Sequence, residues 1–453
     1  MTTRLEIWHP FTQPALDRPP IRIVRAEGVY LYTSDGRRLI DAISSWWVNL
    51  HGHCHPRIAR AIAQQVKQLD HVLLAGVTHD AIDELTAHLR RFLPQTLTHI
   101  FFSDDGSTAV EVALKIALQY WRNIGQPKKT GIVALEHAYH GDTIGAMSVS
   151  ADSGFTDAFA DVRFPVHRVH SAYCYRCPVG KRRETCKIDC LHAMEQLLSS
   201  KHGELAAVIV EPLLQGAGGM IIHPREFLVG IRELCSRYSV LLIADEVLTG
   251  FGRCGPMFAC ELAGVEPDLM CLSKGITGGF LPMGATVCAE FVQKEFVSRD
   301  RTRTFYHGHS YTGNPIACAA AIANLEVFES EPVGQRIAAI AALHGERLAG
   351  LRKHPAVAET RSIGTVAAIE LLAEDPGYGS NLRALLYDFS LTKGVLLRPL
   401  GHVIYVLPPY VITAAELNTV YDVVGEALEF LTKNVELQSI SGINKHQEWC
   451  PKS

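Results

Sequence analysis

The chain has 453 residues, 47% hydrophobic and 20% charged, a composition typical of a globular protein of roughly two or three domains. Lys and Arg total 43 and Asp and Glu total 47, so the net charge is −4 and no basic field attracts nucleic acid. The first residues contain no apolar core of signal-peptide length, and charged residues interrupt the longest apolar stretches. We therefore expect a cytoplasmic protein that binds neither nucleic acid nor membrane.

The first predicted element is a hairpin over residues 28–41, and a helical pattern begins near residue 57. Short apolar strands then alternate with helical segments, notably 107–124 and 225–238. The predicted strands are His99–Ser103, Gly131–Leu135, Ala206–Val210, Val240–Ala244, Asp268–Leu272 and Ala285–Cys288. This alternation predicts an α/β fold with a mostly parallel central sheet and helices on both faces.

After residue 316 the pattern changes to long Ala-rich helices, Ile316–Ser330 and another that ends near Ala349. Strands are predicted near Thr365–Leu371, Val395–Arg398 and Val403–Leu407. We predict a large domain at residues 57–325 and a smaller α+β domain built from both chain ends. The smaller domain comprises residues 1–56 and 326–436, and a polar tail follows at 437–453.

Lys274 and Asp245 each lie at the end of a short apolar strand, where ligands are held in open α/β sheets. A lysine amine can form a Schiff base with the aldehyde of pyridoxal phosphate, and a carboxylate can keep the pyridine nitrogen protonated. Once freed by an amine substrate, the lysine can act as a base that moves a proton. Lys274 and Asp245 are therefore predicted catalytic residues of a pyridoxal phosphate site, and Tyr139 is predicted as a third.

Two further segments suit the same cofactor. Gly106 and Ser107 lie where a strand turns into a helix, and free N–H groups there could bind a phosphate. Helix capping without a ligand is the alternative. Tyr139 follows another strand end, where its ring could stack on a planar cofactor or lie buried in the core.

The chain has 12 cysteines, which we expect to be reduced thiols rather than a disulfide framework. Four of them are closely spaced, at positions Cys174, Cys177, Cys186 and Cys190. This spacing fits a zinc site, whereas the short basic segment between the pairs is typical of a surface loop with unconnected thiols. We predict no metal site.

Several motifs together resemble the class III aminotransferases, which use pyridoxal phosphate. They are Asp104–Glu111, Tyr139–Asp142, Glu211-Pro212, Asp245–Arg253, Ser273–Gly275 and His307–Pro315. The resemblance covers about residues 5–430. It implies a fold-type I homodimer with active sites at the subunit interface, in which Ser310 reaches the phosphate of the neighbouring subunit's cofactor.

Three segments resemble a branch of this family that aminates a long oxo acid in biotin synthesis: Ile7–Thr12, Ser44–Trp47, and Arg398–Gly401 with Tyr405–Tyr410. The tryptophans suit an aliphatic substrate, although a core position is the alternative, chiefly for Trp46. Arg398 suits the far carboxylate of the substrate, and by resemblance alone Arg253 orients a donor carboxylate. The implied substrate-binding residues are Trp47, Tyr139, Arg253, Lys274, Gly308, Arg398 and Tyr405.

Other functions remain as alternatives. Ala217 stands where ornithine- and 4-aminobutyrate-type relatives carry a glutamate, which weakens the case for another ω-aminotransferase. A dinucleotide-dependent dehydrogenase would need a Gly-x-Gly-x-x-Gly turn that the chain lacks at the expected place. A non-catalytic interaction protein on this fold is the third possibility. For the amino donor, S-adenosylmethionine is favoured over lysine.

Overall fold

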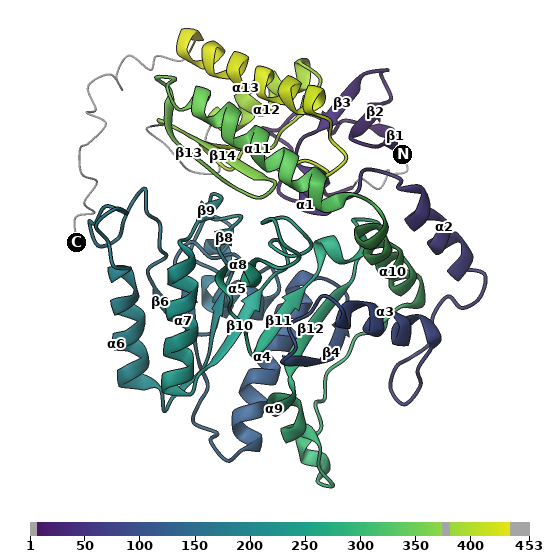
Figure 1. The fold of residues 1–453 in the computed structure, drawn as a ribbon, viewed down its shortest axis with the longest axis vertical. Coiled ribbons are helices and arrows are strands. Elements are labelled where there is room, and N and C mark those ends of the chain that lie inside the picture. The colour runs from purple at the N-terminus through teal and green to yellow at the C-terminus, as the bar shows by residue number, and fades with distance from the viewer. Residues whose placement is uncertain (1–6, 374–380, 435–453) are drawn as a thin grey trace, which may run out of the picture.

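The computed structural model describes residues 7–373 and 381–434 (Figure 1). Within these residues, a seven-stranded sheet has the order β4-β12-β11-β10-β7-β5-β6. Its strands are β4 (Leu97–Ser103), β5 (Gly131–Leu135), β6 (His167–Val169), β7 (Leu205–Val210), β10 (Leu241–Asp245), β11 (Leu269–Leu272) and β12 (Gly284–Ala289).

Most neighbouring strands of this sheet are parallel. β6, β5, β7, β10 and β11 pair in parallel, whereas β12 runs antiparallel to both β11 and β4. Every residue of β7 and β10 is buried, as expected for strands covered on both faces. The predicted α/β fold with a mostly parallel sheet is confirmed. β6 was not predicted, because three residues are too few to show a periodic pattern.

Helices cover the sheet. α4 (Gly106–Asn123) packs against β11 and β12, and α7 (Arg225–Tyr238), predicted with the same bounds, packs against β10. α6 (His192–Lys201) lies beside α7 (Figure 1). The other helices here are α1 (Ser44–Trp47), α2 (Pro56–Gln65), α3 (Asp80–Arg90), α5 (Ile144–Val149), α8 (Ala259–Ala263), α9 (Glu290–Gln293) and α10 (Pro315–Ser330).

Strands from both chain ends share one sheet above the central sheet in Figure 1, with order β1-β2-β3-β15. The predicted hairpin is confirmed as β2 and β3. Together with a second sheet, β13-β14-β16, and the last helices, these strands form what we call the terminal region. Its elements are β1 (Ile23–Glu27), β2 (Tyr30–Thr33), β3 (Arg38–Asp41), α11 (Val333–Leu351), β13 (Val357–Ile363), β14 (Val366–Leu371), α12 (Asn381–Thr392), β15 (Val395–Leu396), β16 (Val403–Val406) and α13 (Ala414–Asn434).

The domain boundaries stay a prediction, and the whole of the predicted polar tail, residues 437–453, lies outside the described residues. A two-stranded hairpin, β8 (Leu214–Gln215) with β9 (Ile221–Ile222), follows β7 and was too short to predict. Across the described ranges, no helix is long and apolar enough to cross a membrane.

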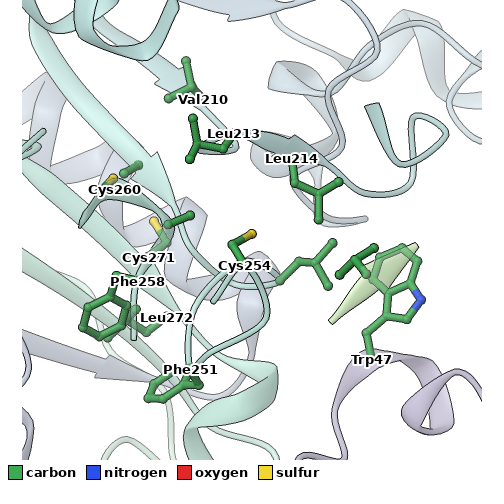
Figure 2. Packing of buried hydrophobic residues seen from close by; sticks show 14 of the residues in the cluster. Trp47, Val210, Leu213, Leu214, Phe251, Cys254, Phe258, Cys260, Cys271 and Leu272 are labelled. Carbon is green, nitrogen blue, oxygen red and sulfur yellow. The ribbon is translucent and has the colours of Figure 1, made fainter. Parts of the chain in front are cut away.

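The hydrophobic core continues from the central sheet toward α1. Figure 2 shows buried residues at the strand ends, among them Val210, Cys271 and Leu272, packed with residues of the following loops. Trp47 belongs to the same cluster and lies at its edge, away from Phe258 (Figure 2). One wall of the site described next is therefore part of the core.

Candidate active site

A cavity of about 460 Å³ lies at the carboxyl ends of β7, β10 and β11. Residues named from the sequence line it together: Trp47, Gly106, Ser107, Tyr139, Asp245 and Lys274. They come from separate parts of the chain, and the topology brings them together because parallel strands end at the same edge of a sheet. Their individual roles stay predictions.

Asp245 is the last residue of β10 and only 4% exposed. Its Oδ2 lies 2.7 Å from Nδ1 of His140, and its Oδ1 accepts the Val247 N–H at 3.1 Å. The other ring nitrogen of His140, Nε2, is buried without a hydrogen-bond partner in the described part of the chain. A buried carboxylate needs a partner, and the structure provides an imidazole that also fixes its orientation.

Lys274 begins the 3₁₀ turn Lys274–Thr277 after β11, which is the neighbour of β10. Its φ of 37° lies in the left-handed region, a conformation that costs about 1–3 kcal/mol outside glycine. The Nζ atom lies 5.1 Å from the centroid of the Trp47 ring. Burial lowers the pKa of the Lys274 amine, an effect that the Asp245 and Glu211 carboxylates partly oppose. A lowered pKa makes the neutral, nucleophilic amine more accessible.

The N-terminus of α4 forms another wall of the cavity. Asp105 caps this helix by accepting the Thr108 N–H at 2.9 Å, and the Thr108 hydroxyl bonds back to the Asp105 backbone. The capping alternative is thus realised by Asp105 and Thr108, while Gly106 and Ser107 line the cavity. The first N–H groups of a helix lack intrahelical partners and favour anions. Capping and anion binding are therefore compatible here.

Gly141 lies directly against Ser107, with no room for a side chain between them. Its φ of 128° is unfavourable for other residues, and a Cβ atom at this position would lie 2.2 Å from Ser107 Oγ. The Asp142 N–H donates to the same oxygen at 3.2 Å. A side chain at position 141 would therefore displace Ser107.

Glu211, immediately after β7, lines the cavity and was named from the sequence only within a motif. Its carboxylate accepts the Tyr139 N–H at 3.0 Å and the Gly216 N–H at 2.9 Å. Burial raises the pKa of Glu211 to about 7 and also raises the pKa of Tyr139. The missed signal was a carboxylate directly after a wholly apolar strand, the same pattern that marks Asp245.

Trp47 and Tyr405 form an apolar corner. Their rings meet edge to face, 5.9 Å apart and at 79°, and both residues are buried. All four residues from Ser44 to Trp47 have positive φ. Of the two tryptophans in this segment, Trp47 is buried and Trp46 is exposed. The alternative of a core position is wrong for Trp46, which is 42% exposed, whereas Trp47 is both core and cavity wall.

Arg398 lies over the face of Trp46, 5.2 Å from its centroid. Its Nη2 donates to the backbone oxygen of Phe11 at 3.5 Å, and Phe11 contacts Trp46 at 5.4 Å between centroids. Arg398 is half-buried and belongs to this aromatic group. Its predicted contact with a substrate carboxylate stays a prediction.

The position of Arg253 differs from that expected of a residue that binds a donor carboxylate. It is 1% exposed, and its guanidinium donates to three backbone oxygens, those of Pro408 at 2.9 Å, Asn49 at 2.9 Å and Trp47 at 3.2 Å. It is not among the described residues that line the cavity. These carbonyls bind both Nη atoms, and Nε is buried without a hydrogen-bond partner in the described residues. Because the guanidinium is buried and held by the backbone, the geometry favours a structural role over the predicted contact with a donor carboxylate.

Gly308 and Ser310 lie in an exposed segment and, within the described ranges, do not line this chain's cavity. The carbonyl of Ser310 lies 2.6 Å from Nε2 of His71. The predicted contact of Ser310 with the neighbouring subunit's cofactor stays a prediction, and so does substrate binding by Gly308.

The cavity has the chemistry that pyridoxal phosphate requires. Asp245 is buried, and in the described residues no Lys or Arg forms an ion pair with it, so the carboxylate can meet a ring nitrogen. An amine, a helix N-terminus and an aromatic ring line the same space. Its volume lies within the roughly 300–1,000 Å³ of small-molecule sites. The residues present therefore fit this cofactor.

The family model described as "Aminotransferase class-III" matches residues 12–428. The chain belongs to the class III aminotransferases. Among its relatives is the adenosylmethionine-8-amino-7-oxononanoate aminotransferase of Synechococcus elongatus, which is 46% identical over 95% of this chain and 100% of the relative. The enzyme of that name from Geobacter sulfurreducens is 42% identical over 95% and 97% of the two chains.

Solved structures of aminotransferases have the same fold as this chain. The crystal structure of an enzyme of the same name from Methanocaldococcus jannaschii is 35% identical and superposes with a TM-score of 0.88 over 94% of this chain and 97% of the other. A PLP-bound amine transaminase from an uncultivated Pseudomonas species has a TM-score of 0.89 at 32% identity, covering 95% of this aminotransferase and 100% of that chain. The fold-type I architecture and the aminotransferase activity implied by the motifs are confirmed.

Proposed function

We propose that this aminotransferase converts 8-amino-7-oxononanoate to 7,8-diaminononanoate in biotin biosynthesis, with S-adenosylmethionine as the amino donor. The similarity to the Synechococcus elongatus enzyme, over the whole of that protein, carries the proposal. The cavity at the strand ends supports the proposal, because its lining combines residues suited to the cofactor with an apolar wall.

Pyridoxal phosphate would be held by four contacts. Lys274 would bind its aldehyde carbon, Asp245 its ring nitrogen, and the α4 N-terminus with Ser107 its phosphate, while Tyr139 would cover the ring. When bound, this cofactor withdraws electrons from the substrate carbon and so stabilises negative charge there.

The chain supplies proton transfer and orientation. Lys274 is the base, because burial lowers the pKa of its amine and the residue lines the cavity. Asp245 supplies a fixed negative charge, and His140 holds that carboxylate at 2.7 Å. Glu211 fixes the Tyr139 backbone through a hydrogen bond of 3.0 Å.

The substrate chain would lie along Trp47, which lines the cavity, and Tyr405, whose ring packs edge to face against it. Rigid aromatic walls bind an aliphatic chain with little loss of side-chain entropy. Arg398 would bind the terminal carboxylate, since its planar guanidinium can form two parallel hydrogen bonds. Homodimer formation, the reach of Ser310 across the interface and a cytoplasmic location complete the proposal.

A half-reaction with the purified enzyme tests the donor. S-adenosylmethionine and lysine are added separately, without oxo acid, and the visible absorbance of the bound cofactor is followed. We expect loss of the band with S-adenosylmethionine alone; loss with lysine alone would overturn the donor assignment.

A second assay tests the acceptor. The enzyme is incubated with its donor and 8-amino-7-oxononanoate, and the diamine product is identified by mass. Turnover of ornithine or 4-aminobutyrate, without turnover of this oxo acid, would identify another ω-aminotransferase instead.

A further inference from the structure

Four cysteines line a second, smaller cavity, separate from the active site. Cys174, Cys177, Cys186 and Cys190 all border a space of about 10 Å³, and Lys181 and Arg183 border it as well. A volume of this size holds roughly one water molecule or a single small ion. Four cysteines that are up to sixteen residues apart in sequence (190 − 174 = 16) therefore border one small cavity.

The four cysteines are not positioned by a helix or strand. Residues 171–188 contain no helix or strand, and only the 3₁₀ turn Asp189–Leu191 follows before α6. We call residues 173–191 the cysteine loop. Its thiols form local contacts: Cys177 Sγ accepts the Lys181 N–H at 3.3 Å, and Cys186 Sγ lies 3.6 Å from Asp189 Oδ2.

The thiols are also electrostatic neighbours. Cys190 lies within electrostatic range of Cys174, Cys177 and Cys186. A soft divalent cation would replace their protons, which pass to solvent, and bind the resulting thiolates.

We propose that the cysteine loop binds one zinc ion through Cys174, Cys177, Cys186 and Cys190. The spacing, two residues within the first pair and three within the second, is that of structural zinc sites. Lys181 and Arg183 offset the net negative charge of a tetrathiolate. No group of three or more ligand side chains in the described residues is already arranged for a metal, so the thiols must rotate into the shared cavity on binding.

Zinc at this position would hold a contact between the two parts of the protein. Tyr173, at the start of the cysteine loop, donates a hydrogen bond from its hydroxyl to Glu370 on β14 of the terminal region. Arg176 forms an ion pair with the same carboxylate. Tyr173 also contacts the ring of His137, two residues before Tyr139 of the active site. A metal that orders this loop therefore keeps Tyr173 and Arg176 in place.

Metal analysis of the intact holoenzyme tests the proposal. The protein is produced in zinc-supplemented medium, freed of loose metal by gel filtration, and analysed by plasma mass spectrometry. We expect about one zinc per chain in the unmodified enzyme and less than about a fifth of that in C174S/C177S. The control is C54S, because Cys54 is an exposed cysteine outside the loop.

Zinc below about a tenth of an equivalent in the unmodified enzyme would overturn the proposal, as would full retention by C174S/C177S. A second measurement needs no variant. A mercurial reagent is titrated into the unmodified enzyme in the presence of a chromogenic zinc chelator. We expect zinc release in proportion to the modification of four thiols per ion; two disulfides in the loop, with no zinc released, would contradict it.

Discussion

Nδ1 of His140 lies 2.7 Å from Oδ2 of Asp245, and both side chains are almost wholly buried. The two residues are 105 positions apart in sequence and meet because a loop after β5 crosses the end of β10. A buried carboxylate that must face a cofactor nitrogen needs a second contact to fix its orientation. His140 provides this contact and acts as a positioning residue.

Replacing His140 with Ala should therefore weaken cofactor binding without removing any predicted cofactor contact. We expect an activity loss of about 10–100-fold, typical when a group that orients a ligand residue is removed. Spectroscopic titration with pyridoxal phosphate measures the affinity. H170A is the control, since His170 pairs with Glu136 at the surface. Unchanged affinity in H140A would contradict the positioning role.

Lys274→Ala should abolish both turnover and the visible absorbance of the bound cofactor. Loss of a positioned acid–base group alone lowers rates by about 10²–10⁴-fold, and here the binding amine is lost as well. The absorbance spectrum and the rate of product formation measure the two effects. K294A, which changes an exposed lysine, should behave as the unmodified enzyme does. Normal turnover in K274A would refute the assignment.

Glu211 should make stability depend on pH. Burial raises its pKa from 4.5 to about 7, so the folded state binds this proton more tightly than the unfolded state. The resulting stabilisation is complete below pH 4.5 and is lost as the pH rises through about 7. Relative to E211Q, the cofactor-free enzyme should lose roughly 3 kcal/mol of unfolding free energy across this window.

Urea unfolding of both proteins at about pH 5 and about pH 8 measures the difference. If the two proteins respond identically to pH, Glu211 titrates near its ordinary value in the folded state.

Arg253→Lys should destabilise the fold rather than weaken donor binding. A lysine cannot reach the three backbone oxygens that the guanidinium contacts, and unsatisfied buried carbonyls cost about 1–3 kcal/mol each. We expect a clear loss of unfolding free energy, measured by chemical denaturation. An unchanged stability with a raised KM for the donor would instead support the contact with a donor carboxylate.

Arg398→Ala should raise KM for the oxo acid and leave the donor half-reaction nearly unchanged. A lost charge-assisted pair corresponds to about 1.5–3 kcal/mol, or roughly a 10- to 150-fold rise in KM. Steady-state kinetics with each substrate varied separately measure both effects. R57A, at an exposed position on α2, is the matched control. Equal effects on both half-reactions would place Arg398 outside the carboxylate site.

Much of the fold was predictable because its signals are local. The apolar strands β5, β7 and β10 and the bounds of α7 follow from short-range periodicity and flanking polar residues. Lys274 and Asp245 were recognised for the same reason, since each ends a buried strand. The short strands β6 and β8 were missed because they contain too few positions to show a period. The longer strands β1 and β13 were missed as well.

By itself, then, the sequence determined the α/β class, the family and the polar residues at the strand ends, because backbone periodicity and motif spacing need no distant contact. Only the tertiary structure decided which side chains meet. In the folded chain His140 contacts Asp245, and the buried Arg253 donates to the Trp47 carbonyl. The four cysteines of the cysteine loop border one cavity. Such contacts depend on how distant segments pack, and packing is a property of the whole folded chain.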